Sequence, residues 1–401
     1  KNLISEKNRD RRLKNMRQTE LWIGGKFVAP SSGEYFDDIN PSDQKAFARV
    51  AKGTSADIGI AVQAAKDAYQ VYKDSQAKQR EKILCDAASI VERDREDYLN
   101  LLIEEVGSPI MKASFEVDYC INALRAAAGV PRRLIGETMP LDRPGAFGLS
   151  IREPVGVVAC ITPFNVPLLK NVKQVAMVIA TGNTSVLLPS EFATQITVKF
   201  AETLHEAGLP PGVFNFVTGD PFVFGVTLTA LPVVSSLNFC GSPRIGKHVA
   251  EIAAKGLKPV TLELGGKNPL IVLDDADLDK ALDAAAMGIF FFQGQACMAS
   301  SRIILQKGIA EDFIPAFKKI ASEIKVGDLS DPETALGPII SDKQVERVKK
   351  FRQSNMSTSA AVEKQKERFI NGAIKNGIAK DVAAGIFLKI EPCLLYTSPS
   401  P

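Results

Sequence analysis

The segment Val155-Gly-Val-Val-Ala-Cys-Ile161, followed by a helical pattern over Pro167–Ala180 and by Thr184-Ser-Val-Leu-Leu188, decides the fold class. Two apolar, β-branched runs of strand length flank a stretch whose periodicity is helical and whose length suits a crossover. A strand, helix and strand joined in this way place the two strands parallel in one sheet. The segment therefore predicts a parallel sheet covered by helices.

The same alternation continues along the chain, which predicts an α/β fold with a Rossmann-type, doubly wound parallel sheet. Further strands are expected at Val213–Val217, Ser235–Cys240, Pro259–Leu264 and Leu270–Leu273, and further helices at Ala193–Ala207, Phe222–Leu231 and Pro243–Lys255. Amphipathic helices are expected earlier, at Ala56–Ala68, Gln79–Asn100 and Ala113–Ala128, before a hairpin over Leu134–Glu153 that is interrupted by Arg143-Pro144-Gly145.

Size and composition indicate a globular protein of more than one domain, with 401 residues of which 45% are hydrophobic. The 49 basic and 46 acidic residues are intermixed, so the net charge of +3 gives no footprint for nucleic acid or an anionic membrane. No apolar run is long enough for a bilayer and no signal-peptide pattern is present, so the cytoplasm is expected. The six cysteines are widely spaced without a C-x-x-C pair, and we expect them to be reduced.

The small number of histidines and the spacing of the acidic residues argue against a metal site. The chain has only two histidines, His205 and His248, both in helix-like stretches, which disfavours His-dependent catalysis and His-ligated metal. Asp275-Ala-Asp-Leu-Asp279 begins like a calcium loop, but Lys280 and Ala286 stand where the loop needs glycine and glutamate. We predict no metal, and we interpret the acidic run as the start of a helix.

Two residues in glycine-flanked settings offer a nucleophile and a base. Glu263 lies in Val260-Thr-Leu-Glu-Leu-Gly-Gly-Lys-Asn-Pro269, and Cys297 ends Gln293-Gly-Gln-Ala-Cys297. A thiolate can attack a carbonyl, and the resulting thioester needs a water that a base activates. Apolar surroundings would raise the pKa of Glu263 toward neutrality. The structural alternatives are a buried, inert cysteine and a helix-capping or ion-paired glutamate.

A third polar residue, Asn165, stands on the turn Thr162-Pro-Phe-Asn-Val-Pro167 between a predicted strand and helix. Its carboxamide can donate to the oxyanion that forms when a thiolate attacks a carbonyl. The alternative is an asparagine that only shapes a proline-bounded turn. The presence of Glu263 and Cys297 in the same chain favours the catalytic interpretation.

The sequence Leu237-Asn-Phe-Cys-Gly-Ser-Pro-Arg-Ile-Gly246 runs from a strand into a helix. Ser242 suits the N-cap and Pro243 the first helical position. Free N–H groups and the helix dipole at such a terminus favour a phosphate group. Gly241, Ser242 and Gly246 are therefore expected to bind the pyrophosphate of a dinucleotide.

Taken in this order, the motifs resemble those of the aldehyde dehydrogenase superfamily, from about Gly24 to about Lys350. The resemblance implies NAD(P)-dependent oxidation of an aldehyde to an acid through a thiohemiacetal and a thioester on Cys297. Asn165 and the backbone N–H of the cysteine would form the oxyanion hole, and Glu263 would activate water. It also implies a second α/β catalytic domain and an oligomerisation hairpin, hence a homodimer or homotetramer.

The resemblance further implies a cofactor site, with NAD expected and NADP as the alternative. Glu191 would accept from the ribose hydroxyl, but Leu188 stands where many relatives carry lysine and Pro221 where glycine is common. The implied cofactor residues are Ile161, Thr162, Phe164, Ser190, Glu191, Gly225, Gly241, Ser242, Gly246, Leu264 and Gly265.

The sequence around the predicted site residues is similar to that of the vanillin and benzaldehyde dehydrogenase branch of the family. Phe164, Phe291 and Met298 match positions that line the substrate tunnel of the family, although each could equally be ordinary core packing. An apolar, aromatic lining of this kind would suit an aromatic or medium-chain aldehyde.

The expected domains are a discontinuous NAD(P)-binding domain over 16–133 and 154–264, the hairpin over 134–153, and a partial catalytic domain over 265–355. Residues 1–15 and 356–401 are expected to be tails, the last residues being artefactual. We therefore expect a C-terminally truncated chain with weak or no activity. Two alternatives stay open: a non-catalytic fragment that keeps the fold as a binding module, and a coenzyme-A-acylating relative, which Glu263 disfavours.

Overall fold

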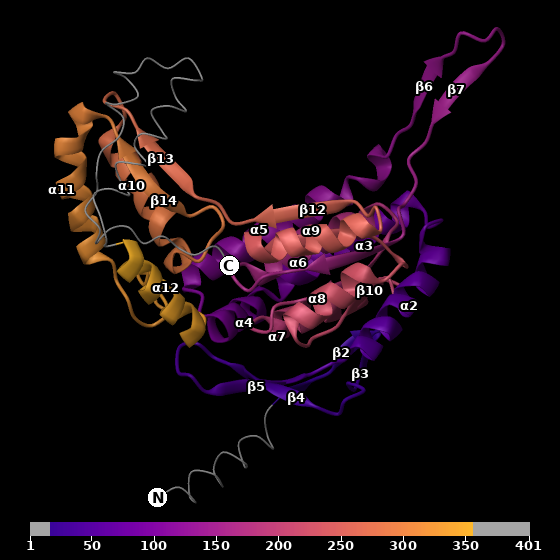
Figure 1. Cartoon of the computed structure of the whole chain (residues 1–401), viewed down its shortest axis with the longest axis horizontal. Coiled ribbons are helices and arrows are strands. Elements are labelled where there is room, and N and C mark those ends of the chain that lie inside the picture. Colours follow the sequence, from indigo (N-terminus) through magenta and orange to yellow (C-terminus); the bar gives the residue numbers. More distant parts are fainter. Residues whose placement is uncertain (1–16, 356–401) are drawn as a thin grey trace, which may run out of the picture. The chain divides into compact units, whose positions relative to one another are not determined.

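A computed structural model describes residues 17–355 of the chain (Figure 1). The chain divides into two compact units, the first comprising Lys1–Val106 and Ala113–Glu263, the second Gly107–Lys112 and Leu264–Pro401. The α/β class predicted from the sequence is confirmed.

The first unit is built on a seven-stranded sheet whose strand order is β12-β11-β8-β9-β10-β2-β3. Strands β11, β8, β9 and β10 run parallel, as predicted, whereas β2 pairs antiparallel with β10 and β3 pairs antiparallel with β2. The strands are β2 (Leu21–Ile23), β3 (Lys26–Val28), β8 (Val157–Ile161), β9 (Thr184–Leu188), β10 (Phe214–Phe216), β11 (Val234–Gly241) and β12 (Val260–Leu264).

Helices cross over both faces of this sheet. The connections through α6 (Pro167–Ala180) and α7 (Thr194–Glu206) step from β8 to β9 and on to β10, whereas α8 (Pro221–Ala230) leads back to β11, where α9 (Pro243–Lys255) follows. Because parallel crossovers are right-handed, this reversal places α8 on the face opposite to α6 and α7. Helix α8 packs against α2 (Ser55–Tyr72), and α6 and α7 pack against α3 (Ala77–Arg93). The prediction of a doubly wound sheet is confirmed.

The prediction of one helix over Gln79–Asn100 is wrong, because α3 ends at Arg93 and α4 (Arg95–Val106) follows. Asp94, at φ −93° and ψ 24°, leaves the helical conformation. Its carboxylate accepts a hydrogen bond from Lys199 Nζ at 2.8 Å, a tertiary contact that the local pattern does not contain.

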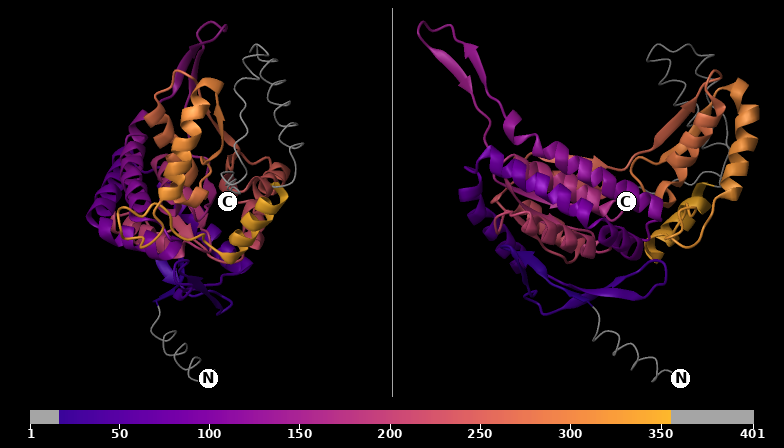
Figure 2. Two further views of the ribbon diagram at one scale, coloured as in Figure 1. Left: turned by 90° about the vertical axis from the view of Figure 1, so that its left-hand side faces the viewer. Right: turned by 180° about the vertical axis from the view of Figure 1, so that it is seen from behind.

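Two smaller β elements complete the first unit (Figure 2). The three-stranded sheet β1-β5-β4, formed by β1 (Arg17–Thr19), β5 (Ala46–Ala51) and β4 (Tyr35–Ile39), was not expected from the sequence. Strands β6 (Glu137–Pro140) and β7 (Phe147–Ser150) form the predicted antiparallel hairpin, after the short helix η1 (Pro131–Arg133) that follows α5 (Ile110–Ala128).

The second unit contains the parallel pair β13 (Asn268–Val272) and β14 (Ser300–Leu305). Its helices are α10 (Leu278–Phe290), η2 (Phe291–Gly294), α11 (Lys307–Glu323) and α12 (Asp342–Asn355). Phe313, Phe317 and Leu282 belong to a buried core shared by the strands, α10 and α11. Asp277 caps α10 by accepting from the Lys280 N–H at 3.1 Å, which confirms that the acidic run starts a helix.

A buried pair of carboxyl groups joins three elements of the first unit. Glu105 of α4 accepts hydrogen bonds from the backbone N–H groups of Gln195 (2.5 Å) and Ile196 (2.9 Å) at the start of α7. Asp38 of β4 is 1% exposed, and the carboxyl group of Glu105 and the backbone N–H of Ile39 lie beside its carboxyl group. Burial raises the pKa of Asp38 to about 7, and burial together with the charge of Asp38 raises the pKa of Glu105. We expect the two acids to share a proton.

We predict that Asp38→Asn stabilises the protein more at pH 8 than at pH 5. In the unfolded chain an aspartate has a pKa of about 3.9, so the folded state holds a proton that the unfolded state has lost. The stability that protonated Asp38 contributes is fully present below the unfolded-state pKa of about 3.9, and it is lost as the pH rises through about 7.

An asparagine stays neutral, so the difference in the free energy of unfolding between pH 8 and pH 5 should shrink by on the order of 2 kcal/mol. Urea unfolding at both pH values measures this, with the neighbouring, more exposed Asp37→Asn as the control. An identical effect of Asp38→Asn at the two pH values would contradict the prediction.

Candidate active site

The carboxyl ends of three parallel strands lie in line along one edge of the large sheet. Ile161, at the end of β8, pairs with Leu188 at the end of β9 and with Phe239 of β11. The direction of the crossovers reverses between β8 and β11, and ligands of open α/β sheets bind at such a switch point. We therefore expect a ligand-binding site at the segments that follow β8, β9 and β11.

Asn165 lies on the turn between β8 and α6, as the sequence indicated. The residue is 2% exposed, and its Oδ1 accepts no hydrogen bond. Thr162 secures the turn, because its N–H donates to Leu188 O at 3.1 Å and its hydroxyl donates to Asn171 Oδ1 of α6 at 2.9 Å. Phe164 is buried and contacts Phe192 edge to face, with ring centroids 6.0 Å apart. The turn is thus held from β9 and from α6.

Ser242 is the N-cap of α9, which confirms that prediction. Its hydroxyl accepts from the Ile245 N–H at 3.4 Å, and Pro243 occupies the first turn. Gly241 closes β11 just before the cap, and Gly246 is buried within the first turns of the helix. The positive end of the α9 dipole therefore stands at the switch point, where it suits a phosphate group.

Glu191 follows β9 on the same edge, one residue after Ser190, whose hydroxyl lies 3.4 Å from Glu191 Oε2. Leu188, at the end of β9, is buried, and its apolar side chain supplies no cation. Gly225 of α8 faces β8: a side chain added to it would meet Ile161 Cδ1 at 3.8 Å. Pro221 opens α8 behind Asp220, whose Oδ1 accepts from the Val223 N–H at 3.0 Å.

Glu263 carries an ion pair that the sequence analysis missed. Its Oε2 lies 3.0 Å from Lys170 Nζ, and the Lys170 side chain is 8% exposed whereas that of Glu263 is 60% exposed. Lys170 lies on α6, five residues after Asn165, which stands on the turn that leads into this helix. Glu263 lies 93 residues after Lys170 in the sequence, so no local pattern indicated this contact.

The prediction that the pKa of Glu263 is raised is wrong. The hydrogen bond from Lys170, the charge of Lys170 and the charge of Lys173 together hold the pKa of Glu263 below its ordinary value, against a smaller effect of burial. The surroundings of the carboxylate are cationic rather than apolar. Glu263 therefore stays ionised, and so able to accept a proton, further into the acidic range than an isolated glutamate.

In the second unit, Cys297 lies in a turn directly after the short helix η2, not inside a helix. The residues before it are twisted, because Phe292, Gln293 and Gly294 all have positive φ angles of 49°, 57° and 73°. Left-handed conformations cost roughly 1–2 kcal/mol for a residue with a side chain, so other contacts must hold this turn. Cys297 is partly exposed and unpaired.

Amide side chains provide those contacts. Gln293 Nε2 donates to Pro338 O at 2.8 Å, and Gln295 Oε1 accepts from the Ile340 N–H at 3.1 Å. Asn268 Nδ2 donates to Cys297 O at 2.9 Å. The two glutamines and the asparagine of the motifs thus fix the backbone of the cysteine turn.

Lys112 is a second residue that the sequence analysis missed. It is 3% exposed, and its ammonium lies 4.3 Å from the centre of the Phe292 ring, an attractive cation–π geometry. Its Nζ also donates to Ser108 Oγ at 2.9 Å. The segment Gly107–Lys112 thereby supports the twisted residues before Cys297 within the second unit.

The structure gathers part of the predicted site in each unit. Asn165, Glu263, Phe164 and the candidates on β8, β9, α8 and α9 belong to the first unit. Cys297, Phe291, Met298, Gly265 and Leu264 belong to the second. The approach of Cys297 to Asn165 and Glu263 stays a prediction.

Two further searches cover residues 17–355. This part of the chain contains no group of three or more His, Cys, Asp or Glu side chains arranged to hold a metal ion. None of its helices combines the length and the apolar character that crossing a membrane requires.

Comparison with known proteins identifies the family. The model of the aldehyde dehydrogenase family matches residues 27–383. The chain belongs to the aldehyde dehydrogenase family. It is 34% identical to retinaldehyde dehydrogenase 3 of Homo sapiens, over 95% of this chain and 77% of the relative. It is 36% identical to vanillin dehydrogenase of Pseudomonas fluorescens, over 83% of this chain and 70% of the relative.

A solved structure gives the same result. The NAD⁺ complex of aldehyde dehydrogenase from Bacillus cereus superposes with a TM-score of 0.82 at 32% identity, covering 86% of this chain and 70% of that chain. The predictions of an enzyme, of NAD(P)-dependent aldehyde oxidation and of NAD(P) as cofactor are confirmed.

We predict that Lys170→Met shifts the acidic limb of the pH–rate profile to higher pH. Lys170 lowers the pKa of Glu263, so removing its hydrogen bond and charge raises that pKa and leaves less ionised carboxylate in mildly acidic solution. Steady-state rates measured across the acidic range test this, with the exposed Lys66→Met of α2 as the matched control. Superimposable profiles for the wild type and Lys170→Met would rule the effect out.

Proposed function

We propose that the chain oxidises an aldehyde to a carboxylic acid by covalent catalysis at Cys297. The thiolate attacks the aldehyde carbonyl, and the carboxamide of Asn165 donates to the oxyanion of the thiohemiacetal. The burial of Asn165 and its position on a turn that is held from β9 and from α6 support this role. The proposal requires the sulfur of the second unit to meet the Asn165 turn of the first.

Glu263 acts in the second half of the reaction. Ionised beside Lys170, it accepts a proton from water, and the hydroxide formed attacks the thioester and releases the acid. The proton then leaves Glu263 to solvent, through its 60% exposed side chain. This ion pair is the observation that carries the proposed hydrolysis, because it holds the Glu263 carboxylate beside α6 and keeps it ionised into the acidic range.

The residues at the switch point fit a dinucleotide, which when bound accepts the hydride. The N-terminus of α9, with Gly241, Ser242 and Gly246, suits the pyrophosphate, and Glu191 after β9 suits a ribose hydroxyl. Ile161, Thr162, Phe164, Ser190 and Gly225 complete the first-unit side of the site, and Leu264 and Gly265 the second-unit side. A carboxylate at Glu191 disfavours a 2′-phosphate, so NAD is the proposed cofactor.

An aromatic aldehyde is the proposed substrate class. Phe164 is already paired with Phe192, and Phe291 and Met298 flank the cysteine turn, Met298 with 58% of its surface exposed. Rings and a thioether of this kind bind an aromatic ring by area and by edge contacts. The similarity to vanillin dehydrogenase supports the same class.

Self-association and location are also proposals. The hairpin leaves Ile135, Phe147, Leu149 and Ile151 exposed, with Ile135 and Phe147 above 70%. Such apolar side chains on a projecting element favour assembly into a homodimer or homotetramer (Figure 1). No disulfide joins the five cysteines within residues 17–355, which suits a reducing compartment such as the cytoplasm.

We predict distinct kinetic defects for the three proposed catalytic residues. Cys297→Ala should abolish NADH formation from benzaldehyde, and Asn165→Ala should slow it by about 10²–10³-fold. Glu263→Gln should keep a first turnover of NADH while lowering the steady-state rate on the order of 10²-fold or more, because only the hydrolysis needs the base.

Stopped-flow absorbance separates the burst from the steady state. Sustained NADH production by Cys297→Ala would disprove the nucleophile. Acceleration of the wild-type enzyme by coenzyme A, with formation of an acyl-coenzyme A, would assign the chain to the acylating reaction instead.

We also predict that Glu191→Gln narrows the preference for NAD over NADP. The neutral amide removes the repulsion of a 2′-phosphate and weakens the bond to the 2′-hydroxyl, so kcat/KM for NAD falls while that for NADP rises or holds. Glu202→Gln on α7 is a control for a charge elsewhere on the first unit. If the wild type strongly prefers NADP and Glu191→Gln leaves that preference unchanged, the ribose assignment is wrong.

A further inference from the structure

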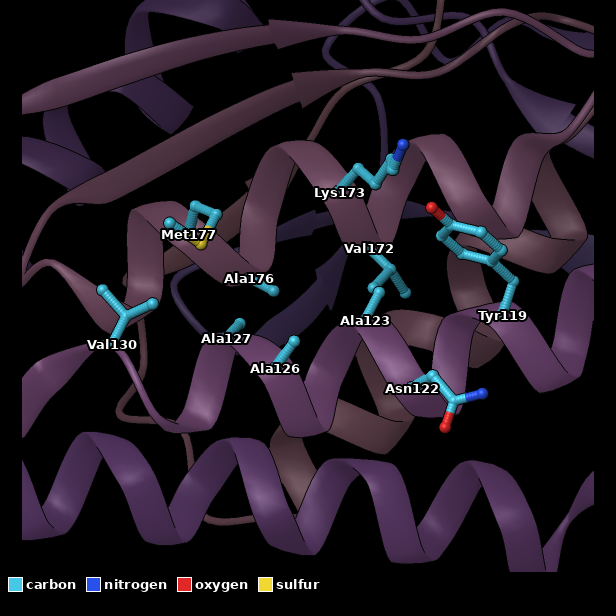
Figure 3. A pocket seen from close by; sticks show the side chains of 10 residues that line it. All are labelled: Tyr119, Asn122, Ala123, Ala126, Ala127, Val130, Val172, Lys173, Ala176 and Met177. Atoms are coloured by element: carbon cyan, nitrogen blue, oxygen red, sulfur yellow. The ribbon is translucent and has the colours of Figure 1, made fainter.

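A groove of about 620 Å³ runs between α5 and α6 in the first unit (Figure 3). Tyr119 and Asn122 of α5 and Lys173 and Met177 of α6 form its rims, and Ala123 and Ala176 are among the small side chains of its floor. Tyr119 and Met177 are 41% and 45% exposed, so both offer surface to a ligand. The groove is apolar along most of its length, with a cation at one position.

Helix α6 connects the groove to the proposed catalytic groups. Helix α6 begins two residues after Asn165, and Lys170, which binds Glu263, lies one turn before Lys173. The charge of Lys173 itself contributes to the lowered pKa of Glu263, so its ammonium lies within electrostatic range of the base. Lys173 therefore stands between the reaction centre of the first unit and the apolar groove.

The ammonium of Lys173 has no carboxylate in direct contact within residues 17–355. Among the described residues it forms no ion pair, and its recorded contact is with the face of the Tyr119 ring, 5.3 Å from the centroid. The contact holds the flexible side chain over the groove, and Figure 3 shows the two residues on opposite rims at the same end of it. A fixed, unpaired cation beside an aromatic ring is suited to a carboxylate attached to an aromatic or apolar group.

We propose that Lys173 is a specificity-determining residue and that the α5–α6 groove receives the distal part of the substrate. The substrate class is then an aromatic aldehyde that bears a carboxylate remote from its carbonyl. The carboxylate pairs with Lys173, and the ring lies against Tyr119 and Met177. This inference rests on the proposed aldehyde oxidation and narrows its substrate.

Competing substrates measure the selectivity. The enzyme is assayed with 4-carboxybenzaldehyde and with its neutral methyl ester, and the ratio of their kcat/KM values is compared between variants. Because both aldehydes use the same Glu263, any change in the pKa of that base cancels in the ratio. The wild type should favour the carboxylate, and Lys173→Met should lower the ratio about three- to tenfold, as for a partly exposed charge-assisted hydrogen bond.

Two further variants serve as controls. Lys173→Arg keeps the charge and should retain most of the ratio, and Lys66→Met, an exposed lysine of α2 outside the groove, should leave it unchanged. An equal ratio in the wild type and Lys173→Met overturns the inference, even though the enzyme oxidises both aldehydes.

A binding measurement keeps the inference testable without turnover. Terephthalate, which cannot be oxidised further, is titrated into the wild type and Lys173→Met by calorimetry, beside the uncharged terephthalamide. Binding of terephthalate that weakens in Lys173→Met while terephthalamide is unaffected supports the groove, whether or not the chain is active. Equal affinity of terephthalate for both proteins refutes it, and absence of any aldehyde oxidation together with lysine-dependent binding would contradict the proposed function alone.

Discussion

The backbone ladder that joins β8 to β9 and to β11 determines the positions of the other first-unit site residues. It aligns Ile161 with Leu188 and Phe239, so the segments beyond the three strands start from one edge. A slip of one residue would turn every buried side chain of a strand to the opposite face. It would also separate the Asn165 turn from the α9 terminus, since each begins where its strand ends. The chemistry of the first unit is thus specified by hydrogen bonds that contain no catalytic atom.

A single helix then connects the functions of that edge. Helix α6 follows the Asn165 turn, carries Lys170 to Glu263, and presents Lys173 to the groove. It is buried on nearly all sides against the sheet and its neighbouring helices, which restricts its rotation and translation. Groups fixed to such a helix keep their mutual spacing when loops move. The three proposed roles, oxyanion stabilisation, control of the base and recognition of the distal substrate group, therefore share one rigid support.

Local signals in the sequence predicted the parts of the site that are themselves local. Ser242 and Pro243 mark a helix start within a few residues, and the proline-bounded turn places Asn165 without knowledge of its neighbours. Lys170 escaped prediction because its partner lies 93 residues away, and a lysine in a helical pattern ordinarily indicates a solvated face. The pKa of Glu263 was misjudged for the same reason.

Elements of two or three residues escaped for a different reason. Strands β2 and β3, of three residues each, are too short to show an alternating pattern, and they are stabilised by the pairing of β2 with β10 and of β3 with β2. The buried pair of Asp38 and Glu105 could not be foreseen either, because two acids 67 positions apart carry no pattern that indicates a shared environment. The break at Asp94 arises from a contact with α7 that a helical periodicity cannot express.

The alanines on the floor of the α5–α6 groove have a consequence for the evolution of this enzyme. Ala123, Ala126, Ala127 and Ala176 contribute the space of the groove by having small side chains, and none of them belongs to the proposed reaction centre. Replacing any of them by a larger residue would shorten or narrow the groove while leaving the nucleophile, the oxyanion donor and the base in place. If the groove receives the distal part of the substrate as proposed, single changes in side-chain volume at these positions would alter the length of substrate that descendants accept without changing the reacting groups.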